Sequence, residues 1–126
     1  MTKVIISEDC GNSPKNIFVQ ELTIAFAKGD TKFIQSNVTE DVRWNMVGDR
    51  LIEGKEKIME MLEQMKDDTA EELAIHHIVT HGKAGTVDGR IKFKNGNTVA
   101  YCNVYEFSNS KGTSVKEITS YEIEIK

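Results

Sequence analysis

The chain has 126 residues, of which 39% are hydrophobic and 29% are charged, a balance typical of a globular domain and far from that of a chain unable to fold. This length suits a single core, so we expect one domain over residues 1–126, with residues 1–12 as a loose N-terminal arm in which residues 3–6 could pair as a short strand. A formal net charge of −4 and a pI near 5.4 argue against a nucleic-acid surface, which needs clustered Lys and Arg.

Neither a secretion signal nor a membrane span is visible in the sequence. The N-terminal segment MTKVIISED has too short an apolar run for a signal peptide, and no stretch approaches the length of a membrane span. We therefore expect a cytoplasmic protein without a membrane partner. Cys10 and Cys102 lie far apart in the sequence, so we expect reduced, structural thiols and neither a metal nor another cofactor.

The first helix has clear boundaries. Ser13 can cap it and Pro14 fits its first turn, where a missing N–H costs nothing. The helix should run to about Lys28 and end at Gly29. Apolar side chains at spacings of three and four predict one buried face, made of Phe18, Leu22, Ala25 and Phe26.

A strand between two further helices comes next. Asp30 can cap a short helix over residues 31–36. In the strand that follows, every second residue is apolar, namely Val42, Trp44 and Met46. A loop that ends at Gly54 then leads into a third helix over about residues 55–66.

The remaining chain alternates strands and turns. Asn95-Gly96 is a strong hairpin signal, because both central residues of a two-residue turn need positive φ. The pattern predicts an α+β domain in which three N-terminal helices pack on one face of a curved, mainly antiparallel sheet. The meander of four or five strands in this sheet should include residues 73–80, 86–94, 98–107 and 113–125.

This order of elements resembles the nuclear transport factor 2-like (NTF2-like) superfamily, and within it the branch of ketosteroid isomerases and SnoaL-like polyketide cyclases. Glu40-Asp41-Val42-Arg43-Trp44 before the loop and Gly54-Lys55-Glu56 after it carry the resemblance, which covers about residues 17–123. It implies a cone-shaped α+β barrel with a pocket between the helices and the concave face of the sheet. It also implies a homodimer formed through the outer face, and such pockets favour small apolar ligands.

The steroid-isomerising residues of that branch are replaced in this chain. The resemblance places Met46 at the position of the catalytic base, or Asn45 when the count runs back from Gly54, and we prefer Met46 because it fits the strand alternation. It places Leu22 at the oxyanion-binding tyrosine and Asn103 at the protonated aspartate. Asn hydrogen-bonds but does not ionise, so this reaction is not expected.

Other ionisable residues are candidates for acid–base chemistry or for ligand contacts. His77 and His81 would share a strand face about 13 Å apart at about 3.3 Å per residue, too far to bind one metal. Either both imidazoles are exposed, or one of the two histidines faces the pocket and acts as an acid or base. Asp49, Arg50 and Glu53 should lie on the loop at the mouth of the cone, where Arg50 could meet an anionic ligand group.

One strand offers two distinct faces. Tyr101, Asn103, Tyr105 and Phe107 alternate onto one face, which is either a ligand-recognising wall or plain core. Small apolar residues on the opposite face suit burial against a second sheet, so we expect a homodimer; they are Ala100, Cys102 and Val104.

Three hypotheses for the function follow. The favoured one is a module that binds a small apolar or aromatic molecule without turnover. The second is an enzyme of the cyclase or isomerase type with a pocket His as acid or base, and the third is a dimerising interaction domain with a filled cone. The candidate ligand-binding residues are Leu22, Trp44, Met46, Tyr101, Asn103 and Tyr105.

Overall fold

The computed structural model describes residues 2–7, 13–65, 69–109 and 114–125. Three helices and seven strands lie within these ranges. In chain order they are β1 (Lys3–Ile6), α1 (Pro14–Lys28), α2 (Thr31–Ser36), β2 (Val38–Met46), β3 (Arg50–Glu53), α3 (Lys55–Gln64), β4 (Ala70–His81), β5 (Ala84–Phe93), β6 (Thr98–Phe107) and β7 (Val115–Ile125). None of these helices is long and apolar enough to cross a membrane.

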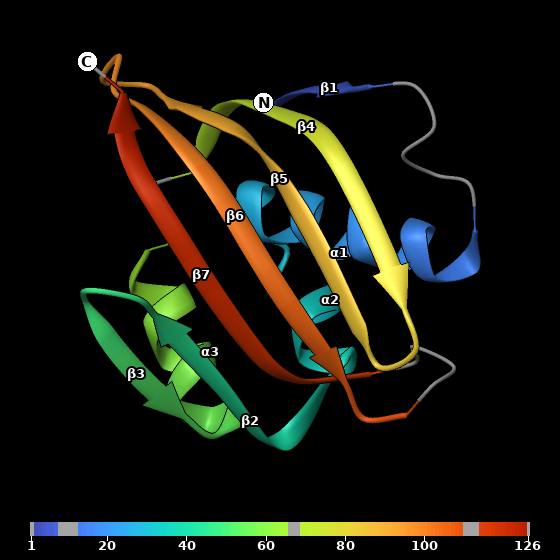
Figure 1. The fold of residues 1–126 in the computed structure, drawn as a ribbon. Coiled ribbons are helices and arrows are strands. Elements are labelled where there is room, and N and C mark those ends of the chain that lie inside the picture. The colour runs from blue at the N-terminus through green and yellow to red at the C-terminus, as the bar shows by residue number, and fades with distance from the viewer. Residues whose placement is uncertain (1, 8–12, 66–68, 110–113, 126) are drawn as a thin grey trace.

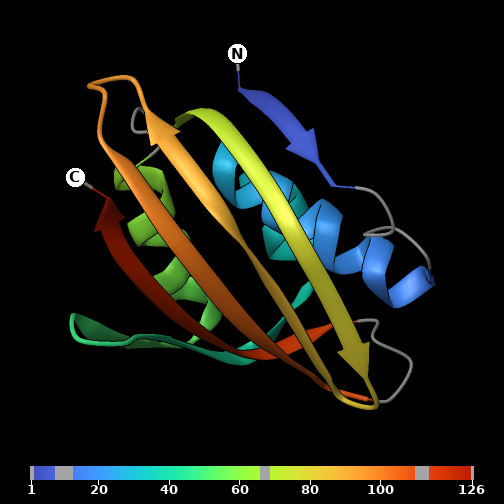
Figure 2. The same ribbon diagram turned by 45° about the horizontal axis from the view of Figure 1, so that its top comes forward.

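The strands form one mixed sheet in the order β1-β4-β5-β6-β7-β2-β3. The helices lie on one side of this sheet, which curls around them, and the other side is uncovered (Figures 1 and 2). We call the uncovered side the outer face. The architecture is therefore α+β, consistent with the cone expected from the resemblance.

Local sequence signals set both ends of α1 and the start of α2 as predicted. The Ser13 side chain accepts a hydrogen bond from the Asn16 N–H at 3.1 Å, and Pro14 occupies the first turn of α1. Gly29 ends α1 with a φ of 76°, a left-handed conformation that favours glycine. Asp30 caps α2 by accepting a hydrogen bond from the Phe33 N–H at 3.2 Å.

Strands β4 to β7 form the predicted antiparallel meander, but the sheet is larger than this meander. β1 pairs with β4 and β2 pairs with β7, both in parallel. Parallel pairs join segments that are distant in sequence, so local patterns do not reveal them. The Asn95-Gly96 turn is present within a longer loop over residues 94–97, in which Gly96 has a φ of 93° and the Phe93 N–H donates to the Asn97 carbonyl at 2.9 Å.

The short strand that the N-terminal arm could form is present, since Lys3–Ile6 is β1, while residues 8–12 lie outside the described part. Two features differ from the sequence expectation. The helices do not all precede the sheet, because β1 comes before α1, and β2 and β3 come before α3. Arg50–Glu53 forms β3 rather than loop, because Gly48 adopts a φ of 83° and turns the chain back onto β2.

The core lies between α1, α3 and the concave face of the sheet. Its fully buried side chains include Leu22, Ile58, Leu73, Tyr105 and Phe107. Burial of such apolar surface is the main stabilising contribution to the fold.

Candidate ligand-binding cavity

A cavity of about 410 Å³ lies inside the cone. Helix α1 contributes Phe26 to its wall, β2 contributes Trp44, and β4 contributes Leu73. Most of the lining residues are apolar, and the polar ones include a buried or half-buried set at the inner end and an exposed set at the mouth, namely Thr23, Asn103 and Ser120, and Asp49, Arg50 and Glu122. The cone is therefore not filled by its own side chains, which argues against the filled-cone hypothesis.

Five of the six candidate ligand-binding residues line this cavity, namely Trp44, Met46, Tyr101, Asn103 and Tyr105. The expectation for Leu22 was wrong. Leu22 lies one helical turn before Phe26 on α1, is buried within the core cluster, and is not among the residues that line the cavity.

Strand β2 places Trp44 and Met46 toward the cavity and Asn45 on the exposed side. The alternation of apolar residues in the sequence therefore identified the face of β2 that lines the cavity. The Trp44 ring packs edge-on against Phe26 with the ring centroids 5.0 Å apart. Its Nε1–H donates a hydrogen bond to Ser120 Oγ at 2.9 Å, which links β2 to the neighbouring β7.

A chain of hydrogen bonds closes the inner end. Thr23 Oγ1 donates to the Val19 carbonyl at 2.8 Å and lies 3.2 Å from the Tyr105 hydroxyl. Because Thr23 has only one hydroxyl proton, Tyr105 is the donor of the second bond. The Asn103 side chain hydrogen-bonds to Tyr105 in turn.

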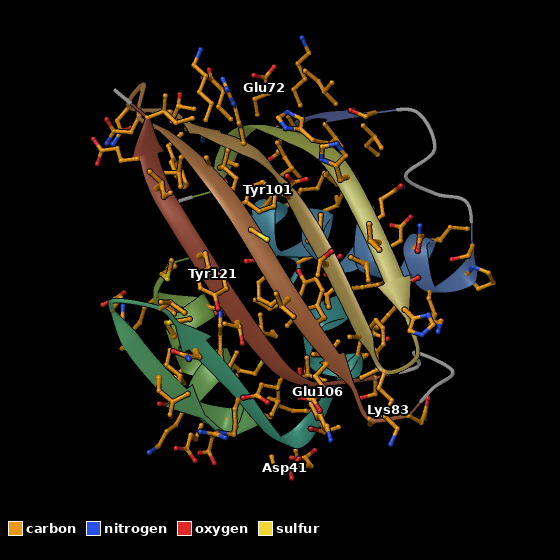
Figure 3. The ribbon with its side chains drawn as sticks, viewed as in Figure 1. Asp41, Glu72, Lys83, Tyr101, Glu106 and Tyr121 are labelled. Atoms are coloured by element: carbon orange, nitrogen blue, oxygen red, sulfur yellow. The ribbon has the colours of Figure 1, made fainter. Side chains whose placement is uncertain are left out.

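Burial raises the pKa of Tyr105 to about 12, although the hydrogen bonds to Thr23 and Asn103 act to lower it. The phenol is therefore neutral over the physiological range. Tyr101, labelled in Figure 3, uses its hydroxyl differently: it donates to the Ala74 carbonyl on β4 at 3.0 Å. The Tyr101 hydroxyl thus holds two strands of the sheet together.

The mouth of the cavity carries charge. Asp49 and Arg50 line the cavity there, with Arg50 Nε 3.7 Å from Asp49 Oδ2, whereas Glu53, which was expected at the mouth as well, ends β3 and does not line the cavity. Glu122 faces them from β7, and although the residue as a whole is exposed, its carboxyl loses hydration against the wall. This burial, together with the negative charge of Asp49, raises the pKa of Glu122, so its carboxyl can hold a proton at higher pH than an ordinary glutamate.

Sequence reasoning missed Thr23, Ser120 and Glu122. Ser120 and Glu122 alternate with Thr119 and Tyr121 along β7, and they pair with Asn103 and Tyr101 on β6. The alternation was visible in the sequence, but the register that aligns the two strands was not.

The hypothesis of a pocket histidine was wrong. The His77 side chain is 77% exposed on the outer face, and its Nδ1 lies 2.9 Å from Asp88 Oδ1. The register of the β4–β5 pair shifts between Ile75 and His77. His81 is exposed at the end of β4. In the part of the chain that the structure describes, no group of three or more His, Cys, Asp or Glu side chains could hold a metal ion.

The fold and the cavity define a protein of the NTF2-like superfamily. A family model for the SnoaL-like domain matches residues 19–115, and the chain belongs to that family. The comparison with curated proteins gives no match.

Solved structures share this fold at low sequence identity. A protein from Shewanella putrefaciens CN-32 assigned as a SnoaL-like polyketide cyclase has a TM-score of 0.77 and 16% identity, over 90% of this chain and 83% of that one. An LEH-like epoxide hydrolase from M. tuberculosis gives 0.70 and 18%, over 83% and 79%. An NTF2-like protein of unknown function from Cytophaga hutchinsonii ATCC 33406 gives 0.69 and 21%, over 85% and 97%. These similarities establish the fold.

Proposed function

We propose that this protein binds a small apolar or aromatic molecule in the cavity of the cone. The observation that carries the proposal is the cavity itself, about 410 Å³ in volume and bounded by apolar side chains with few polar groups. Concave sites with this division of surface suit small ligands, because apolar walls provide affinity and a few polar groups fix orientation.

The lining is consistent with this role. Phe26 and Trp44 form an aromatic corner, and Met46 adds a flexible, polarisable wall that can adapt to a ligand. The residues that a steroid isomerase would use are replaced, and the histidines lie outside the cavity. Binding without turnover needs only apolar walls and a few polar groups, and the described site has both.

The methionines allow a test on the unmodified protein. Met46 and Met65 line the cavity, whereas Met59 lines a separate shallow groove on the surface. With methyl-labelled methionine, saturating naphthalene should shift the NMR signals of Met46 and Met65 and leave that of Met59 in place. If the signals of Met46 and Met65 do not move, the proposal is wrong.

We propose in addition that two chains pair through the outer face. Its centre consists of Ala100, Cys102 and Val104 on β6, next to Tyr121 and Ile123 on β7. Ile123 is 72% exposed and Tyr121, labelled in Figure 3, is 48% exposed. An uncovered apolar strip of this kind is typical of a protein interface.

The proposal of a cytoplasmic location rests on the free thiol of Cys102. Partial burial and the nearby Asp88 carboxylate raise the pKa of Cys102, so the thiol stays protonated and poorly reactive. Cys10 lies outside the described residues.

A further inference from the structure

The inner end of the cavity contains a hydrogen-bond donor without an acceptor. Ser120 is 8% exposed and lines the cavity. An indole N–H can only donate, so Ser120 Oγ accepts in its bond to Trp44 and its own hydroxyl proton is left over. No group in the part of the chain described by the structure accepts that proton, and a buried donor of this kind costs stability unless something binds to it.

The neighbouring amide has a fixed orientation. Tyr105 gives its proton to Thr23, so Asn103 must offer an N–H to the Tyr105 oxygen. The carbonyl oxygen of the Asn103 amide is then the atom that remains as an acceptor in the cavity.

These two groups lie next to each other. Asn103 on β6 and Ser120 on β7 are directly paired across the antiparallel strands, and both line the cavity. Opposite residues in such a pair have Cβ atoms about 5 Å apart. One small polar group of a ligand can therefore reach both side chains.

We propose that the cavity selects a neutral ligand with an amide edge, a lactam or a primary carboxamide attached to an apolar body. The carbonyl oxygen of the ligand accepts from the Ser120 hydroxyl, and its N–H donates to Asn103 Oδ1. This inference rests on the proposed function and deepens it, because it names the class of polar group at the inner end.

The first test compares three probes of similar size on the unmodified protein by isothermal titration calorimetry. Quinolin-2(1H)-one carries the amide edge, N-methylquinolin-2-one keeps the carbonyl but lacks the N–H, and naphthalene has no polar group. One neutral hydrogen bond corresponds to about threefold to tenfold in affinity, so quinolin-2(1H)-one should bind that much tighter than its N-methyl derivative.

Two variants test which side chain binds the carbonyl oxygen of the ligand and which binds its N–H. Ser120→Ala should weaken both quinolinones by about threefold to tenfold while keeping the preference for the N–H compound. Asn103→Ala should abolish that preference. Thr119→Ala and Asn45→Ala, whose side chains lie on the outer face, are matched controls and should leave all three affinities unchanged.

The outcomes separate the two proposals. Naphthalene binding without a preference for quinolin-2(1H)-one overturns the amide-edge inference and leaves the proposed function standing. A preference that survives in Asn103→Ala also overturns the inference. If none of the three probes binds, both proposals are wrong.

Discussion

One added methyl group at Gly89 should have a severe effect on the stability of the fold. Gly89 on β5 lies between β4 and β6, where the Tyr101 hydroxyl crosses over it to reach the Ala74 carbonyl. A Cβ at position 89 would overlap the carbonyl oxygen of Ala74 and lie 2.8 Å from its carbonyl carbon and 2.9 Å from the Tyr101 hydroxyl oxygen. Because the obstacle is backbone in the middle of a sheet, no side chain can move aside to make room.

The expected cost of Gly89→Ala follows from two contributions. Overpacking in a close-packed interior costs about 1–3 kcal/mol, and the lost hydrogen bond between Tyr101 and Ala74 adds about 1 kcal/mol. We therefore expect a loss of about 3 kcal/mol from a free energy of unfolding that is typically about 5–15 kcal/mol. In urea denaturation this should lower the midpoint by about 1–2 M.

Gly85 on the same strand provides the control. An added Cβ there would lie 3.1 Å from three atoms of the Phe107, Thr80 and Val19 side chains, which can shift by a few tenths of an ångström. Gly85→Ala should therefore cost about 1 kcal/mol or less. Equal midpoints for Gly89→Ala and Gly85→Ala would refute the reasoning, since the backbone contact at Gly89 would then have no energetic consequence.

Two further predictions concern the mouth of the cavity and the outer face. The pKa of Glu122 is raised from its usual value of 4.5 in the folded state, so the stability linked to its protonation is present below that value and is lost as the pH rises through the folded pKa. Glu122→Gln should therefore raise the melting temperature near neutral pH but not at about pH 4, and an equal rise at both would contradict this assignment. Ile123→Asp should convert the proposed dimer to a monomer in sedimentation velocity at micromolar concentration, because Ile123 is 72% exposed beside Ala100. Ile17→Asp on α1 is the control and should leave the oligomer intact; a wild-type monomer under these conditions would refute the dimer.

The polar groups at the two ends of the cavity should contribute differently to ligand recognition. At the mouth, Asp49, Arg50 and Glu122 are accessible to solvent, where charge interactions are screened and contribute little. At the inner end, Ser120 is buried and Asn103 is half-buried, so an unmatched hydrogen bond costs more there. Selectivity among neutral ligands should therefore be decided at the inner end.

Local sequence signals determined the ends of helix α1, the faces of several strands and the order of the elements. The cap at Ser13, the stop at Gly29 and the alternation of Val42, Trp44 and Met46 depend on residues close together in the chain, so they could be predicted directly. The same alternation placed Asn103 and Tyr105 on one face of β6. The order of elements was enough to indicate the superfamily.

Only the tertiary structure decided which residues meet. The parallel pairing of β2 with β7 brings Trp44 to Ser120, 76 positions away, and the β6–β7 register sets Ser120 opposite Asn103. It also buried Leu22 and turned His77 outward. The alternation along a strand shows which of its side chains share a face. Which strands pair, and in which register, depends on contacts between segments far apart in the chain.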